Sequence, residues 1–130
     1  MRPSPDATTI AATPKVFVNK QGVPVLDKLL APDDHEGLHD MYLRFTPRAT
    51  AGGLPPADDR ECVRWVDRLI SAGMHLIAVA FDHTVIGHAV LLPMKKRICE
   101  LLIAVLPEFQ KSGVGSHLLR SVIQFAAELG

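Results

Sequence analysis

The sequence predicts an α/β or α+β fold in a single domain. Apolar residues recur at helical spacing from Val63 to Ile70 and from Val114 to Leu129. Short apolar runs from Leu76 to Phe81 and from Val85 to Leu92 instead suit strands. A chain of 130 residues, 48% of them hydrophobic, is long enough for one compact core and too short for two independent domains.

The chain begins with a tail that we expect to be disordered. Residues 1–14 are rich in Pro, Thr and Ala and lack the apolar stretch of a secretory signal peptide, so the domain is expected to span 15–130. Val16 to Val18 and Val23 to Leu29 are then two apolar runs. The residues between them, Asn19 to Gly22, have the turn chemistry of a β-hairpin.

Two helices are expected after this hairpin. Asp33 and Glu36 fit a capping box, and the apolar residues that follow predict a helix from about Asp34 to Phe45. Asp58 and Glu61 repeat the capping pattern ahead of a second apolar stripe. The sequence therefore predicts two helices before the remaining strands.

The second half of the chain is predicted to form most of the sheet. Gly73 is placed to end the second helix in a left-handed turn. The runs Leu76 to Phe81 and Val85 to Leu92 read as an antiparallel pair joined by a tight turn. Ile98 to Val105 is nearly all aliphatic apart from Glu100, which is typical of a central strand covered on both faces.

Composition limits the classes of partner and the compartment. Fourteen basic residues balance fourteen acidic ones, so the net charge gives no reason to expect binding to nucleic acid or to a membrane. No apolar run approaches the roughly 20 residues that a membrane-spanning helix needs. Cys62 and Cys99 lie in apolar segments, where we expect inert core thiols, and they form neither a disulfide framework nor a metal cluster. A reducing, cytoplasmic location is expected.

The most informative stretch joins the aliphatic strand to the long helix at residues 105–116. Gly113 and Gly115 remove side chains where a ligand would approach the backbone, and the first turn of the helix has unpaired amide hydrogens at the positive end of its dipole. Such a cradle suits a diphosphate. Glycines are also common in any tight turn between a strand and a helix. The loop matches neither a Rossmann fingerprint nor a P-loop, which disfavours NAD and ATP.

Residues 110–115, Gln-Lys-Ser-Gly-Val-Gly, resemble the central signature of the GNAT superfamily of N-acyltransferases, Gln/Arg-x-x-Gly-x-Gly/Ala. The order of elements before this loop also looks like that family. The resemblance implies a three-layer fold with a mixed, mostly antiparallel central sheet flanked by helices. Family members continue past the long helix with further strands, so we expect the fold to be incomplete at its C-terminus. The unpaired strand edge would then favour aggregation or homodimerisation.

The resemblance also implies the ligands and the reaction. Acetyl-CoA, or another short acyl-CoA, would donate its acyl group to a primary amine, and no metal is expected. In the family, the strand binds the pantetheine arm through its backbone and the loop amides bind the pyrophosphate. The cofactor-binding residues carried over are Ile103, Ala104 and Val105 for pantetheine, Lys111, Ser112, Gly113, Val114, Gly115 and Ser116 for pyrophosphate, and Gln110 as the first residue of the signature. Lys111 either adds charge to this site or is a solvated surface lysine.

One residue is the candidate general base. Glu100 is the only charged residue of the most apolar strand, where desolvation would raise its pKa toward a useful range. Several GNAT members carry a catalytic glutamate at the matching place. The alternative is that Glu100 only accepts hydrogen bonds or pairs with Arg97. Many relatives protonate the leaving thiolate with a tyrosine after the long helix, but the only tyrosine here is Tyr42. A lone strand histidine such as His88 is more often structural than catalytic.

Two alternatives to acyl transfer remain open. One is a non-catalytic GNAT-like module that only binds acyl-CoA. The other is a zinc metalloprotease, because residues 35–39 read His-Glu-Gly-Leu-His and formally match His-Glu-x-x-His. The protease is disfavoured because Glu36 is already explained as a capping residue, Gly37 weakens the helix, and no third ligand is identifiable.

Overall fold

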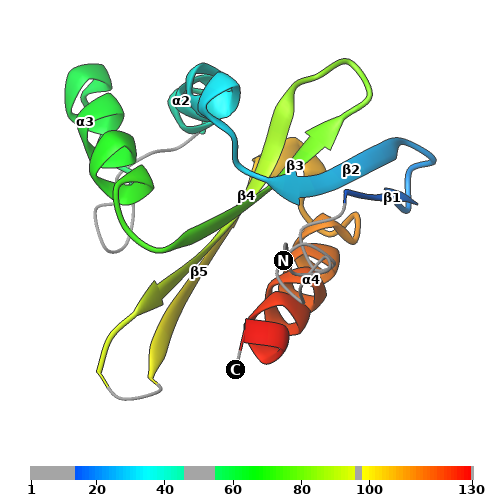
Figure 1. Ribbon diagram of the computed structural model, residues 1–130. Coiled ribbons are helices and arrows are strands. Elements are labelled where there is room, and N and C mark those ends of the chain that lie inside the picture. Colours follow the sequence, from blue (N-terminus) through cyan, green and yellow to red (C-terminus); the bar gives the residue numbers. More distant parts are fainter. Residues whose placement is uncertain (1–13, 46–54, 96–97, 130) are drawn as a thin grey trace.

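The computed structural model describes residues 14–45, 55–95 and 98–129. All but the last residue of the tail expected over 1–14 lies outside this part of the chain. In the described residues, five strands form one sheet in the order β1-β2-β3-β4-β5, and each neighbouring pair is antiparallel (Figure 1). The strands are β1 (Lys15–Val18), β2 (Pro24–Leu29), β3 (Met74–Ala80), β4 (Val85–Pro93) and β5 (Cys99–Val105).

Helices cover both faces of this sheet, which gives the expected three-layer arrangement (Figure 1). The helical segments are the short 3-10 turns η1 (Pro32–Asp34) and η2 (Pro107–Phe109) and the α-helices α2 (His35–Leu43), α3 (Asp59–Ile70) and α4 (Val114–Leu129). One face carries α4, which comes so close to β4 that a Cβ on Gly87 would lie 2.9 Å from Leu118. The opposite face carries α2, where a Cβ on Gly37 would lie 3.0 Å from Val85. None of the helices in the described ranges is long and apolar enough to cross a membrane.

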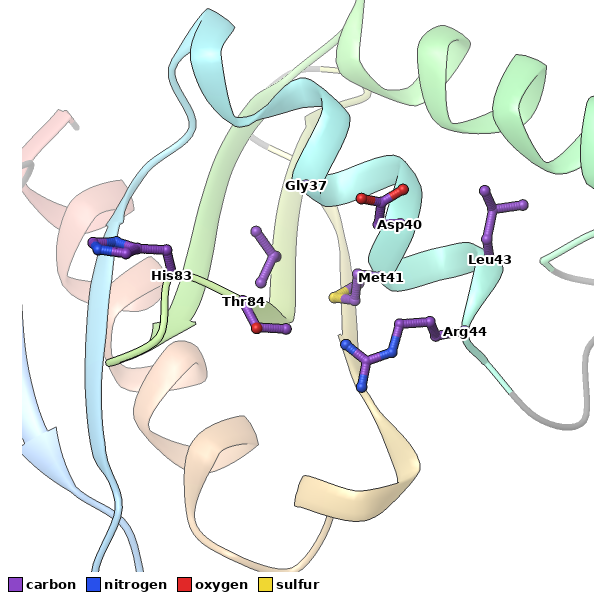
Figure 2. Close-up of a pocket in the computed structure, with 8 residues that line it drawn as sticks. Gly37, Asp40, Met41, Leu43, Arg44, His83 and Thr84 are labelled. Carbon is purple, nitrogen blue, oxygen red and sulfur yellow. The ribbon is translucent and has the colours of Figure 1, made fainter.

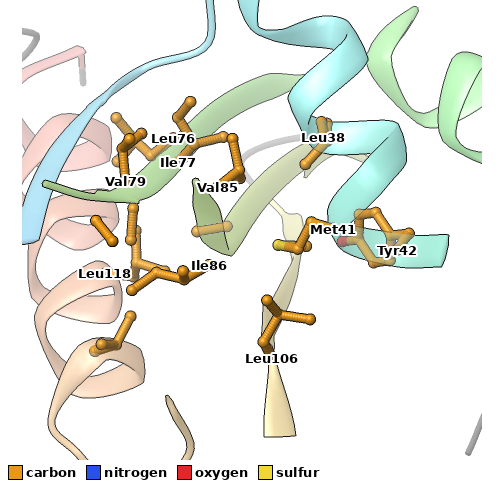
Figure 3. Close-up of a cluster of buried hydrophobic side chains, with 14 of the residues drawn as sticks. Leu38, Met41, Tyr42, Leu76, Ile77, Val79, Val85, Ile86, Leu106 and Leu118 are labelled. Carbon is orange, nitrogen blue, oxygen red and sulfur yellow. The ribbon is translucent and has the colours of Figure 1, made fainter. Parts of the chain in front are cut away.

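The core forms on both sides of β3 and β4. Figure 3 shows side chains from α2, from these two strands and from α4 gathered there. Leu38 and Met41 of α2, Ile77 of β3, Ile86 of β4 and Leu118 of α4 are all fully buried. Burying such side chains removes apolar surface from water and fixes the positions of the three layers.

The N-terminal hairpin is confirmed. Val18 of β1 pairs with Pro24 of β2. The turn is organised by Asn19, whose Oδ1 atom accepts hydrogen bonds from the backbone amides of Gln21 and Val23, both at 2.9 Å. Gly22 takes a φ of +81°, which a residue with a side chain rarely adopts. Asn19 and Gly22 thus form the tight turn that the sequence predicts between the two strands.

The first expected helix is confirmed, but its predicted capping box is wrong. The turn η1 precedes α2, and it shifts the capping role from Asp33 to the next residue. The carboxylate of Asp34 accepts a hydrogen bond from the backbone amide of Ala31 at 2.8 Å and pairs with Lys28 at 2.9 Å. Glu36 makes no such contact and is exposed. A proline at the start of the turn, Pro32, favours this tighter geometry.

The second helix and its two ends follow the prediction. Asp58 Oδ1 accepts a hydrogen bond from the backbone amide of Glu61 at 2.9 Å, which caps α3. Gly73 follows the helix with a φ of +77°. A Cβ atom there would lie only 2.5 Å from the carbonyl oxygen of Leu91. Glycine is therefore required at residue 73 by both its conformation and its surroundings.

The prediction that Ile98 to Val105 forms a central strand covered on both faces is wrong. In the sheet that the described residues form, the corresponding strand, β5, is the last in the order and pairs with β4 on one side. Its side chains are exposed or half-buried, and Leu101 is 39% exposed. The strands covered on both faces are β3 and β4. An aliphatic composition indicates a strand that packs on neighbours, but it does not fix the order of strands in the sheet.

Candidate functional site

The loop between β5 and α4 has the conformation that its glycines permit. After the turn η2, Lys111 has a φ of +63° and Gly113 a φ of +100°. A Cβ atom on Gly113 would meet no other atom within 4 Å, so the space beside it is open. The helix α4 begins at the next residue, and its first turn leaves amide hydrogens without intrahelical acceptors at the positive end of the helix dipole.

A hollow of about 270 Å³ lies beside this loop. It is lined by Lys20, Val105, Gln110, Lys111, Gly113, Gly115 and Ser116. Six of the ten residues predicted to bind the cofactor are therefore brought together here. Among the described residues that line it, Lys20 and Lys111 are the charged ones, and both are cations. The arrangement of glycine backbone, helix N-terminus and lysines suits a phosphorylated ligand.

The other four predicted residues have different surroundings. Ser112 is 1% exposed, and its hydroxyl donates to the carbonyl oxygen of Phe109. Val114 is fully buried, and it lies 3.2 Å from a Cβ placed on Gly87. Ile103 and Ala104 are half-buried in β5. The side chains of Ser112 and Val114 therefore hold the loop in place, which leaves their backbone groups as the parts that could face a ligand.

Gln110, the first residue of the signature, ties the loop to the preceding strand. Its side-chain Nε2 donates to the carbonyl oxygen of Val105 at 3.1 Å. The Gly115 backbone contributes in a different way from Gly113, since a Cβ there would lie 3.6 Å from the Val105 side chain, an ordinary contact distance. A side chain at residue 115 therefore fits the protein but would project beside the hollow.

The model of the acetyltransferase (GNAT) family matches residues 35–130. The chain belongs to the GNAT acetyltransferase family. None of the curated proteins matches the chain significantly.

Solved GNAT structures share this fold at low sequence identity. The GNAT domain of PAT from S. lividans has a TM-score of 0.73 and 19% identity, over 90% of this chain and 73% of that one. A GNAT N-acetyltransferase from Escherichia coli, YhbS in complex with CoA, has a TM-score of 0.62 and 19% identity, over 82% of this chain and 58% of that one. The PaiA N-acetyltransferase of Thermoplasma acidophilum, in complex with coenzyme A, has a TM-score of 0.60 and 20% identity, over 82% of this chain and 74% of that one.

Sequence reasoning missed Lys20, which reaches the GNAT loop from the hairpin. Its backbone amide donates to the carbonyl oxygen of Ser112 at 2.9 Å. The sequence around Lys20 carries the signal of a hairpin turn and nothing that points to a partner 92 residues further along the chain. Only the tertiary structure brings this lysine to the hollow.

A buried polar cluster joins the hairpin to α4 just beyond the loop. Asp27 of β2 is 3% exposed, and its Oδ2 atom lies 2.5 Å from His117 Nδ1 and 3.3 Å from the hydroxyl of Ser121, which donates to it. Burial raises the pKa of Asp27, while the hydrogen bond and positive charge of His117 act in the opposite direction. The ring of His117 also stacks on Phe17 of β1, with 3.8 Å between ring centroids.

The burial expected for Glu100 is not found. Its side chain is exposed on β5, opposite Leu92 of β4. The premise that this strand desolvates the carboxylate is therefore wrong for the described structure, in which β5 pairs with β4 alone. Arg97, its alternative partner, lies outside the described residues. The role of Glu100 as a general base stays a prediction that rests on the family resemblance.

Three buried side chains, one each from α2, β4 and β3, form a hydrogen-bonded chain. His88 is fully buried, and its Nδ1 lies 2.7 Å from the hydroxyl of Tyr42 while its Nε2 lies 2.9 Å from His75 Nδ1. His75 Nε2 lies 2.6 Å from the carbonyl oxygen of Ala72. Burial lowers the pKa of His88 to about 3, lowers that of His75 and raises that of Tyr42, so all three favour their neutral forms. This agrees with the structural role expected for His88.

A second hollow, of about 420 Å³, lies between α2 and the turn that joins β3 to β4. Figure 2 shows Asp40 of α2, Arg44 directly after this helix, and His83 and Thr84 of that turn around it. Arg44 forms an ion pair with Glu108 of η2 at 3.2 Å. Polar and apolar residues therefore line this hollow together, and Arg44 is already paired with Glu108.

The zinc motif does not assemble with a third ligand. His39 Nε2 lies 2.6 Å from Asp67 Oδ1 of α3, which accounts for this histidine as part of a contact between helices. Among the described residues, no three His, Cys, Asp or Glu side chains come together as a group that could hold a metal. The two cysteines are free, Cys62 in the core as expected and Cys99 exposed, so the expectation of a core thiol is wrong for Cys99.

Proposed function

We propose that this chain carries the coenzyme site of an N-acyltransferase that moves an acetyl or another short acyl group from acyl-CoA to a primary amine. The observation that supports this most directly is the open hollow formed by Gly113, the α4 N-terminus and two lysines. Two structures with the same fold, from E. coli and T. acidophilum, are complexes with coenzyme A. Two free cysteines are compatible with our expectation of a cytoplasmic location.

In the proposed reaction, the amine nitrogen attacks the thioester carbonyl of acyl-CoA. The nitrogen–carbon bond forms, the carbon–sulfur bond breaks, one proton leaves the amine, and one proton reaches the sulfur. The backbone of residues 103–105 would hold the pantetheine arm, and the amides at the start of α4 would hold the diphosphate. Glu100 is our candidate for taking the amine proton, since its exposed carboxylate is accessible to an acceptor from solvent.

Calorimetric titration with acetyl-CoA tests the coenzyme site. The decisive variant is Gly115→Glu, because a side chain fits at this helical position without backbone strain and would place a negative charge beside the hollow. We expect it to weaken acetyl-CoA binding at least tenfold, through repulsion of the phosphates. Ile123→Glu is the matched control, since Ile123 is 56% exposed on the same helix and outside the lining. Failure of the folded wild-type chain to bind acetyl-CoA would contradict the proposal.

One observation favours a second candidate, a GNAT-like module that binds acyl-CoA without catalysis. The candidate base, Glu100, is exposed on β5 rather than buried, so the structure gives it no desolvated setting for proton transfer. Release of CoA thiol in the presence of a panel of primary amines separates the two candidates. Turnover that is lost in Glu100→Gln supports the enzyme, whereas binding without turnover supports the module.

A further inference from the structure

The β1–β2 hairpin forms part of the hollow although it lies outside residues 35–130, the segment that matches the GNAT family model. Its turn reaches the glycine loop through Lys20, whose backbone amide donates to the Ser112 carbonyl oxygen at 2.9 Å. The Lys20 side chain is exposed and lines the hollow together with residues of the loop and of α4. The hairpin therefore adds a wall and a positive charge to a site that the family signature alone does not contain.

Several contacts fix the position of this hairpin. The two hydrogen bonds accepted by Asn19 Oδ1 hold the turn, and the ring of Phe17 stacks on His117 of α4. His117 is held in turn by the buried Asp27 of β2. The backbone of Lys20 is therefore attached to the same helix whose N-terminus borders the hollow. A lysine whose backbone is fixed loses less freedom when its ammonium group binds a ligand.

The charges around the hollow favour a ligand with more than one phosphate group. Lys20 belongs to the hairpin and Lys111 to the loop, and no acidic side chain is found among the described residues of the lining. The two lysines belong to different segments, and both line the same hollow. The helix N-terminus supplies amide donors to the same hollow.

We propose that Lys20 is a coenzyme-binding residue, whose ammonium group pairs with a phosphate of acyl-CoA in the hollow that it lines together with Lys111. This inference rests on the proposed function and adds a residue of the hairpin to the coenzyme site. The hairpin then recognises the phosphorylated nucleotide part of the coenzyme, while β5 serves the pantetheine arm. The predicted consequence is a salt-dependent contribution of Lys20 to acyl-CoA affinity.

The test compares Lys20→Met with Lys20→Arg by calorimetric titration with acetyl-CoA at low and high salt. Neither substitution removes the backbone hydrogen bond to Ser112, so the hairpin keeps its attachment. We expect Lys20→Met to bind roughly fivefold more weakly at low salt, as for a partly solvated charge pair, and Lys20→Arg to bind within about twofold of the wild type. Because exposed charges are screened by salt, the difference should shrink as ionic strength rises. Lys95→Met, at an exposed lysine in the segment between β4 and β5, is the control.

Each outcome separates the two proposals. If the wild-type chain binds acetyl-CoA and Lys20→Met binds it equally well, Lys20 is not a coenzyme-binding residue, although the proposed function stands. A loss that is equal in Lys20→Arg, or that does not change with salt, indicates a structural effect and overturns the inference as well. If the folded wild-type chain does not bind acetyl-CoA, the proposed function itself fails.

Discussion

The hydrogen bonds of Tyr42, His88 and His75 allow one arrangement of protons in their neutral forms. His75 Nε2 must donate to the carbonyl oxygen of Ala72, so His75 Nδ1 accepts from His88 Nε2. His88 Nδ1 then accepts from the Tyr42 hydroxyl. Each polar group of this buried chain thus has a partner, which is the condition for burying such groups at low cost.

Tyr42→Phe tests this arrangement at a single atom. It keeps the aromatic ring, which packs edge-on against Trp65, and removes only the hydroxyl. Because His88 Nδ1 would lose its donor in a fully buried place, we expect the free energy of unfolding to fall by about 1–3 kcal/mol. Urea denaturation at neutral pH measures this change. A loss below about 0.5 kcal/mol, the range of ordinary surface substitutions, would contradict the assigned hydrogen bond.

The two histidines also predict how stability depends on pH. Burial lowers the pKa of His88 to about 3 and lowers that of His75, which is further disfavoured as a cation by nearby His35. In the unfolded chain both titrate near about 6.5, so below that pH the unfolded state binds protons that the folded state does not. The free energy of unfolding should therefore fall as pH drops below about 6.5, by up to about 1.4 kcal/mol per pH unit for His88 down to about pH 3, and His75 should add to this fall.

Urea denaturation at pH 7.5, 6 and 5 measures this dependence for the whole chain. NMR titration of the ring nitrogens assigns it to the histidines, because the signals of His88 should remain those of a neutral imidazole at pH 5. Protonation of His88 near its ordinary pKa in the folded state would show that the buried chain is not as described.

At the scale of elements, two glycines with similar backbone conformations have different surroundings. Gly22 has a φ of +81° and open space where a Cβ would lie, whereas Gly73 has a φ of +77° and the carbonyl oxygen of Leu91 only 2.5 Å away. We expect Gly22→Ala to lower the free energy of unfolding by about 1 kcal/mol through backbone strain alone. Gly73→Ala should cost about 3 kcal/mol or more, because it adds a clash between the end of α3 and β4. Thermal or urea unfolding of both variants gives the difference, and equal losses would contradict the close approach.

The elements show what local sequence can predict. Asp58 caps α3 and Gly73 takes a positive φ, both as predicted, because both effects depend on a few neighbouring residues. The burial of Glu100 was wrong because it depends on the position of β5 in the sheet, which distant segments decide. The cap at Asp34 was missed because it is coupled to Lys28 on the neighbouring strand. The contribution of Lys20 could not be predicted either, since only the tertiary fold brings the hairpin to the glycine loop.

At the scale of the whole molecule, the hairpin and α4 act as one support for the glycine loop. Asp27 and Phe17 hold His117 from two neighbouring strands, and Lys20 is bonded to the loop itself. Residues near the N-terminus thereby position a site formed mainly by the C-terminal third of the chain. Weakening this contact should therefore affect both the stability of the fold and its affinity for the coenzyme.

Phe17→Ala and Val16→Ala provide a matched pair for this expectation. Phe17 is half-buried against His117, whereas Val16 is the adjacent residue of β1 and is 70% exposed. We expect Phe17→Ala to lower the free energy of unfolding by about 1–3 kcal/mol and Val16→Ala to change it by less than about 0.5 kcal/mol. If the hairpin holds Lys20 at the coenzyme, Phe17→Ala should also weaken acetyl-CoA binding by a factor close to that of Lys20→Met, and the double variant should lose little more. Unchanged affinity in a destabilised Phe17→Ala chain would show that the hairpin stabilises the fold without serving the site.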